Sequence, residues 1–144
     1  MFTHILIPTD GSERSQRAVQ GGIELARTLG ARVTAFHVIP RFHTSDVMMG
    51  LLASQSDYEA AAQAYARGQL ESVALAARAA GVACETAHAT GDDVAREIVA
   101  AATRVGCDLI LMASHGRRGI EGVLLGSETH KVLTHSHLPV LVYR

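Results

Sequence analysis

Short apolar runs alternate with longer amphipathic segments along the whole chain. The apolar runs predict strands at residues 5–8, 32–39, 82–89, 108–113 and after Pro139. The segments between them have helical periodicity, and we expect helices over residues 12–30, 57–80, 91–105 and 127–136. Strands that alternate with helices in this way predict a single-domain α/β fold, with a five-stranded parallel sheet, doubly wound and Rossmann-like, and helices on both faces.

Local signals define where the helices begin and end. Ser12 is expected to cap the first helix, and Gly30 to end it. Asp92 is the expected cap of the helix that follows the third strand. The strand at 108–113 is apolar throughout and is expected to be central, whereas the alternating strand at 82–89 suits a position near a sheet edge. The first helix should bury a face of Ala18, Gly22, Ile23, Ala26 and Leu29.

Residues 41–56 form the least regular part of the chain. Four flexible apolar side chains, Met48, Met49, Leu51 and Leu52, lie within it. The sequence allows two interpretations, a packed extra turn or a ligand lid or partner surface.

A strand, a glycine-containing loop and a helix start follow one another between residues 109 and 127. Gly116, Gly119 and Gly122 lie in the loop, which ends at Gly126 and Ser127. Glycines let backbone N–H groups approach a ligand closely, and the first turn of a helix presents unpaired N–H groups and the positive end of its dipole. The unit therefore favours an anion such as phosphate, although its spacing matches neither the P-loop nor the GxGxxG pattern.

The spacing also resembles a specific family signature. Ala113 is followed after two residues by Gly116, and nine residues later by Gly126 and Ser127. This pattern is similar to the ATP-binding signature of the universal stress protein family, with Ala113 where the family pattern has glycine. Segments 5–12, 37–39 and 139–144 resemble the family's first, second and last strands. The likeness covers nearly the whole chain, with only residues 41–56 poorly matched, and implies one domain, residues 1–144.

The resemblance implies a strand order of 3-2-1-4-5 and a site for ATP, ADP or AMP at the carboxyl ends of strands 1 and 4, where strand order reverses. Magnesium would arrive with the phosphates. By matching positions, the residues that would border the adenine are Thr9, Asp10 and Val38. Those at the ribose end would be Pro8, Met112 and Ala113. The phosphates would be contacted, largely through backbone N–H groups, by Gly116, Gly126, Ser127 and Glu128.

The charged loop residues and the turn after strand 1 have simpler interpretations as well. His115 and Arg117 lie within the binding loop, and Arg117 and Arg118 are candidates to clamp phosphates or else ordinary solvated charges. Residues 8–12 also suit a plain turn and helix cap. Glu128 lies at the expected helix start, where its carboxylate would repel phosphates unless magnesium bridges them or the side chain turns outward.

Composition and charge exclude several classes of function. The formal net charge is −1, which provides no general attraction to nucleic acid or anionic lipid. The sequence contains neither a signal-peptide pattern nor an apolar stretch of the ~20 residues that span a membrane, so we expect a cytoplasmic protein. Cys84 and Cys107 are expected to be free, mostly buried thiols.

The chain has 8 histidines, but their spacing predicts neither a metal site nor a catalytic site. His130, His135 and His137 are expected to be solvated. We expect His115 to have no nucleophile partner, and Ser114 and Ser127 to lack a base and orienting group. No catalytic residue and no protein-ligated metal is therefore predicted.

The predicted function is that of an ATP-binding universal stress protein, acting as a nucleotide-responsive regulatory module. A slow ATPase or nucleotidyl transferase and a nucleotide-free dimeric interaction protein are the alternatives. The last strand would leave an apolar sheet edge of Val140, Leu141 and Val142 unpaired, which predicts a homodimer joined along that strand.

Overall fold

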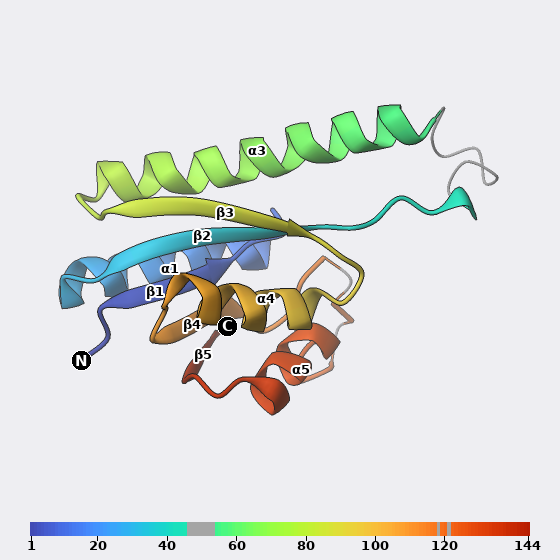
Figure 1. The fold of residues 1–144 in the computed structure, drawn as a ribbon. Coiled ribbons are helices and arrows are strands. Elements are labelled where there is room, and N and C mark those ends of the chain that lie inside the picture. The colour runs from blue at the N-terminus through green and yellow to red at the C-terminus, as the bar shows by residue number, and fades with distance from the viewer. Residues whose placement is uncertain (46–53, 118, 121) are drawn as a thin grey trace.

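The computed structural model describes residues 1–45, 54–117, 119–120 and 122–144. Strands and helices alternate along the chain, as the periodicity predicts (Figure 1). The segment around Met48, Met49, Leu51 and Leu52 lies outside the described residues, so neither interpretation of it is tested. The elements are β1 His4–Pro8, α1 Glu13–Leu29, β2 Arg32–Ile39, α3 Gln55–Ala79, β3 Cys84–Thr90, α4 Val94–Val105, β4 Leu109–Ala113, α5 Ser127–His135 and β5 Val140–Tyr143.

The strands form one five-stranded parallel sheet in the order β3-β2-β1-β4-β5. β1 pairs with β2 on one side and with β4 on the other, so the strand order reverses between β1 and β4. The predicted fold class and strand order are thereby confirmed. Because ligands of such sheets bind where the order reverses, the loops after β1 and β4 are the segments of interest.

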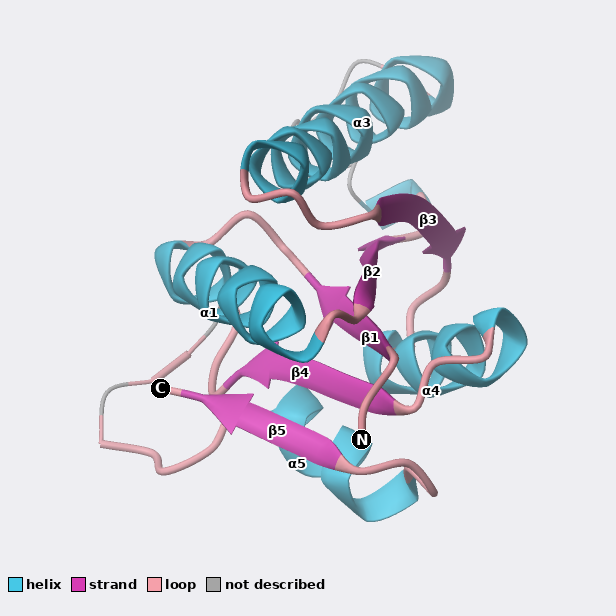
Figure 2. Cartoon of the chain, turned by 90° about the vertical axis from the view of Figure 1, so that its left-hand side faces the viewer, coloured by secondary structure: helices cyan, strands magenta, loops and turns pink. Residues whose placement is uncertain are grey.

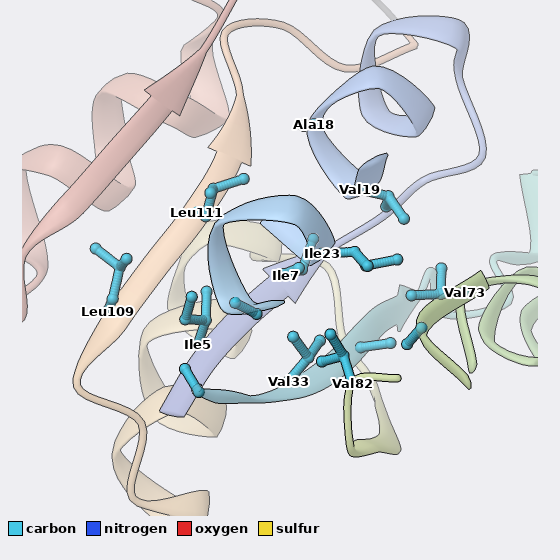
Figure 3. Close-up of a cluster of buried hydrophobic side chains, with 14 of the residues drawn as sticks. Ile5, Ile7, Ala18, Val19, Ile23, Val33, Val73, Val82, Leu109 and Leu111 are labelled. Atoms are coloured by element: carbon cyan, nitrogen blue, oxygen red, sulfur yellow. The ribbon is translucent and has the colours of Figure 1, made fainter. Parts of the chain in front are cut away.

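The helices cover both faces of the sheet (Figure 2). α1 and α3 lie on one face and α4 and α5 on the other. Side chains of β1 alternate between the two layers, because successive residues of a strand point to opposite faces. Ile5 and Ile7 pack under α1 with Ile23 and Leu111, as Figure 3 shows, while Leu6 packs against Ile98 of α4.

Small corrections to the predicted elements have local causes. α4 begins at Val94 with Asp93 as its cap, because the Asp93 carboxylate accepts a hydrogen bond from the Arg96 N–H at 3.2 Å. Asp92 instead accepts hydrogen bonds from the Arg41 backbone and the His43 ring. Leu29 is 39% exposed rather than part of the buried face of α1, since it is the last helical residue before the left-handed Gly30.

The remaining elements agree closely with the sequence pattern. The Ser12 hydroxyl caps α1 by accepting a hydrogen bond from the Ser15 N–H, and Gly30 ends the helix with a φ of 66°. β3 is an edge strand and β4 is buried along its whole length, as expected. No helix in the described part of the chain is both long and apolar enough to cross a membrane.

Candidate functional site

The loop after β1 is a compact turn held by side-chain oxygens. The Thr9 N–H donates to the Phe36 carbonyl of β2 at 2.8 Å. The Thr9 hydroxyl accepts hydrogen bonds from the Ser15 hydroxyl and from the Gly11 N–H. Gly11 has a φ of 80°, and a Cβ at this position would collide with the Tyr65 hydroxyl. The turn therefore requires glycine both for its backbone conformation and for the close approach of α3.

Asp10 joins the β1 loop to the glycine loop, which is far away in the sequence. Its carboxylate accepts a hydrogen bond from the Ser12 N–H at 2.9 Å and another from the Arg117 N–H at 2.7 Å. A Cβ on Gly116 would lie only 2.7 Å from the Asp10 Oδ2 atom, so the loop can approach this closely because residue 116 is glycine. The two segments expected to meet at the switch point therefore do meet.

The far end of the glycine loop is fixed against β4. The Gly126 N–H donates to the Ser114 carbonyl at 2.8 Å, and the Thr129 hydroxyl donates to the Ala113 carbonyl at 2.9 Å. A Cβ on Gly126 would lie 3.2 Å from both the Ser114 oxygen and the His115 Cα atom. The close fit places the start of α5 directly beside the carboxyl end of β4.

Gly126 is the N-terminal cap of α5 and has no side chain with which to accept a hydrogen bond. By contrast, α1, α3 and α4 each begin with a Ser or Asp side chain that accepts a backbone N–H of the first turn. The first turn of α5 therefore leaves its N–H groups for another acceptor, at the positive end of the helix dipole. This end of the helix suits an anion, with Ser127 and Glu128 contributing their N–H groups.

The side chain of Glu128 is directed toward the start of α4. Its Oε2 atom accepts a hydrogen bond from the Ala95 N–H at 2.9 Å, and its Oε1 atom lies 3.2 Å from the Lys131 ammonium. The carboxylate thus caps α4, because the first turn of that helix also has N–H groups without partners. The predicted phosphate contact of Glu128 is therefore restricted to its backbone N–H, and its carboxylate is not placed to repel phosphates.

The predicted ribose residues belong mainly to the strand ends. Met112 and Ala113 are each no more than 8% exposed, and their side chains pack into opposite core layers. They can meet a ligand only at the edge of the sheet, largely through backbone atoms. Pro8 ends β1, and the half-buried Val38 lies near the end of β2, at the same edge.

His115 is buried rather than exposed in the loop. Its Nδ1 atom lies 3.1 Å from the Ser114 hydroxyl, a partner that the sequence analysis did not foresee. Its Nε2 atom is buried and has no hydrogen-bond partner among the described residues. In the described part of the chain, no third group therefore contacts Nε2 to orient the ring as a general base.

Tyr65 lies beside both loops, which the sequence does not reveal, because the helical pattern over residues 57–80 predicts only that Tyr65 belongs to a helix. Its hydroxyl donates to the Asp10 carbonyl at 2.7 Å. The Arg117 guanidinium lies over its ring, 4.8 Å from the centroid, and also donates to the hydroxyl. The edge of the ring meets His37, whose Nδ1 atom lies 2.7 Å from the Thr9 carbonyl. Arg118 lies outside the described residues.

Three of the histidines are buried, at the two ends of the sheet. His37 and His115 lie at the carboxyl end, and His4 lies at the amino end, where its Nε2 atom is 2.7 Å from the Thr34 hydroxyl. His130, His135 and His137 are exposed, as expected. Among the described residues, no cluster of His, Cys, Asp and Glu is arranged to hold a metal ion.

The two cysteines, Cys84 and Cys107, are shielded from water, which raises the pKa of each thiol. Cys107 is buried and Cys84 half-buried, and both are free thiols, as predicted. Desolvation raises the pKa of Cys107 to about 11, and it also raises the pKa of Cys84. Both groups are therefore thiols at neutral pH and weak nucleophiles.

A surface hollow of about 540 Å³ lies between α4 and α5, away from the glycine loop. Its lining includes Arg96, Arg104, Lys131 and His135, but none of the predicted nucleotide residues. The candidate anion site is therefore formed by the two loops and not by this hollow.

Fold and site together define a doubly wound α/β domain with a glycine loop and an uncapped helix start at its switch point. The model of the universal stress protein family matches residues 1–144, and the chain belongs to this family. It is 35% identical to Universal stress protein MJ0531 of Methanocaldococcus jannaschii, over 100% of this chain and 83% of that protein. It is 32% identical to Universal stress protein YxiE of Bacillus subtilis, over 100% of both chains.

Solved structures show the same architecture. The structure of MJ0577 from M. jannaschii superimposes with a TM-score of 0.83 at 28% identity, covering 99% of this chain and 95% of that one. A universal stress protein solved in complex with cAMP has a TM-score of 0.73 at 25% identity, covering 99% of this chain and 97% of its own.

Proposed function

We propose that this universal stress protein binds an adenine nucleotide between the β1 loop and the glycine loop. The observation that carries the proposal is the start of α5. Gly126 leaves the first-turn N–H groups without a side-chain cap, directly beside the carboxyl end of β4. A phosphate group supplies the negative acceptor that such a helix start favours.

The remaining parts of the site suit the rest of a nucleotide. The β1 loop and the end of β2 offer Thr9, Asp10 and Val38 at the adenine end, and the strand ends offer Pro8, Met112 and Ala113 near the ribose. Gly116, Gly126, Ser127 and Glu128 offer backbone donors to the phosphates, with His115 and Arg117 in the same loop. The likeness to a family member solved with cAMP supports the adenine assignment.

In the cell, the protein acts in the cytoplasm as one domain that responds to nucleotide by binding rather than by turnover. ATP, ADP and AMP all present adenine and at least one phosphate, and magnesium accompanies ATP or ADP through the phosphates. The protein works as a homodimer joined along β5, where Val140, Leu141 and Val142 form an edge of the sheet.

Mass spectrometry of small molecules released from the purified protein, followed by calorimetry with ATP, ADP and AMP, tests the proposal. We expect an adenine nucleotide to be released, and at least one of the three to bind saturably with a stoichiometry of one per chain. If no adenine nucleotide copurifies and none of the three binds at millimolar concentration, the proposal is wrong.

A further inference from the structure

We propose that the Tyr65 ring holds the Arg117 guanidinium while the site is empty, and that phosphates draw the guanidinium away when nucleotide binds. This inference rests on the proposed nucleotide site and adds to it a residue from α3. Tyr65 is then a positioning residue for Arg117. Because nucleotide binding breaks the contact between them, the loss of that contact lowers the affinity for nucleotide.

Three segments distant in sequence meet at this contact. Tyr65 comes from the first half of α3, Arg117 from the glycine loop and Asp10 from the β1 loop. The Arg117 backbone N–H is bound to the Asp10 carboxylate, while the Asp10 carbonyl accepts the Tyr65 hydroxyl. Asp10 therefore holds the tyrosine and the Arg117 backbone beside one another, within reach of the arginine side chain.

The tyrosine is the fixed partner. Its hydroxyl is bound to Asp10, and its ring and the His37 ring pack edge to face with centroids 5.7 Å apart. His37 is buried and is itself held by the Thr9 carbonyl. Gly11 leaves no room for a Cβ beside the hydroxyl, so the turn closes tightly around the tyrosine.

The arginine side chain is the mobile partner. Arg117 is exposed, and the contacts that the described structure gives its guanidinium are the face and the hydroxyl of one tyrosine. A guanidinium has five N–H donors in a planar fork, and a phosphate can accept two of them with opposite charge. A bound phosphate therefore competes successfully for a group whose partners among the described residues are the neutral ring and hydroxyl of Tyr65.

Two substitutions of Tyr65 distinguish the contribution of its ring from that of its hydroxyl. Tyr65→Leu removes the surface on which Arg117 rests, and we expect ATP to bind about two- to fivefold more tightly, the equivalent of one exposed cation–π contact. Tyr65→Phe keeps that surface and loses only the hydroxyl that accepts from Arg117, so its affinity should lie between those of the wild type and Tyr65→Leu. If Tyr65 acted only through its hydroxyl bond to Asp10, Leu and Phe would have the same effect.

The direct readout is the Nε–Hε NMR signal of Arg117 in the wild-type protein. Because the Arg117 guanidinium lies over the Tyr65 ring, the ring current shifts this signal. The signal is assigned by its loss in Arg117→Lys, and the Arg78 signal on α3 serves as the control. We expect ATP titration to move the Arg117 signal toward its position in Tyr65→Leu, while the Arg78 signal stays in place.

The outcomes separate this inference from the nucleotide proposal. If ATP binds and the Arg117 signal keeps its ring-current shift, the exchange is wrong and the nucleotide site stands. If ATP binds and Tyr65→Leu leaves the affinity unchanged or weaker, the ring does not compete with the phosphates and the inference is also wrong. If no adenine nucleotide binds the wild type, both proposals fail together.

Discussion

Single residues determine how closely the loops at the switch point approach one another. A Cβ on Gly116 would press on the Asp10 carboxylate, and one on Gly126 would press on the backbone of Ser114 and His115. These glycines are visible in the sequence, and the strand order that the family resemblance implies correctly predicted that the two loops meet. Tyr65 and His37 could not be found in the same way, because helical or strand periodicity identifies the face of a residue but not its neighbour in space.

His4 makes the stability of the protein dependent on pH. It is 2% exposed, and its Nε2 atom lies 2.7 Å from the Thr34 hydroxyl, so the ring is shielded from the water that would solvate its charged form. Burial, assisted by the nearby Arg32, lowers the pKa of His4 below its ordinary 6.5. The unfolded chain therefore binds the proton more readily, and the stability present above pH 6.5 is lost as the pH falls through the lowered pKa.

We expect the melting temperature of the wild type to fall between pH 7 and pH 5 more steeply than that of His4→Gln. His88→Gln removes an exposed histidine on β3 and should retain the wild-type slope. Equal slopes for the wild type and His4→Gln would show that His4 is not a source of the dependence.

At the scale of elements, α4 and α5 are joined at their first turns. Glu128 of α5 accepts the Ala95 N–H of α4, while Asp93 caps the same helix start from its own side. The sequence pattern predicted both helices but could not predict this bond, since it depends on the two helices lying side by side on one sheet face. α5 also begins at the glycine loop, so the start of α4 is tied to the proposed phosphate site.

Glu128→Ala should therefore reduce stability instead of changing the magnesium dependence of nucleotide binding. We expect a loss of about 1 kcal/mol in the free energy of unfolding, the usual effect of removing a helix cap. Glu128→Gln keeps an acceptor oxygen and should lose less. Urea denaturation measures the loss, and calorimetry with ATP in magnesium and in chelator measures the metal dependence. A selective gain of affinity for Glu128→Gln in chelator would show instead that the carboxylate faces the phosphates.

At the scale of the whole molecule, the sheet has an open edge at β5. The Pro139 carbonyl accepts a hydrogen bond from Ile110 of β4, and the Tyr143 carbonyl accepts one from Ser114, the residue that follows β4. Backbone groups of successive residues in a parallel strand point to opposite sides, so those of Val140 and Val142 face the open edge. The alternation of strands and helices predicted the sheet and its edges, whereas a single chain does not show what covers an edge, and the homodimer stays a prediction.

Val142→Pro should convert the homodimer to a monomer, because it removes an edge N–H and leaves the β4 pairing intact. Light scattering at micromolar concentration measures the mass, and circular dichroism confirms that the variant is folded. Val142→Thr keeps the N–H and should remain dimeric. A wild type that is monomeric, or a dimer that survives in folded Val142→Pro, would contradict pairing along β5.

The central claim is that the glycine loop and the start of α5 hold the phosphates of an adenine nucleotide. Calorimetric titration of ATP into the wild type and into Gly126→Val tests it most directly, because the added side chain lies beside the Ser114 and His115 backbone at the start of α5. Gly68→Ala is the control, since a Cβ there meets no heavy atom within 4 Å. We predict that Gly126→Val loses at least tenfold in affinity, about 1.4 kcal/mol, while Gly68→Ala binds like the wild type. Unchanged ATP affinity in a folded Gly126→Val protein would contradict the account.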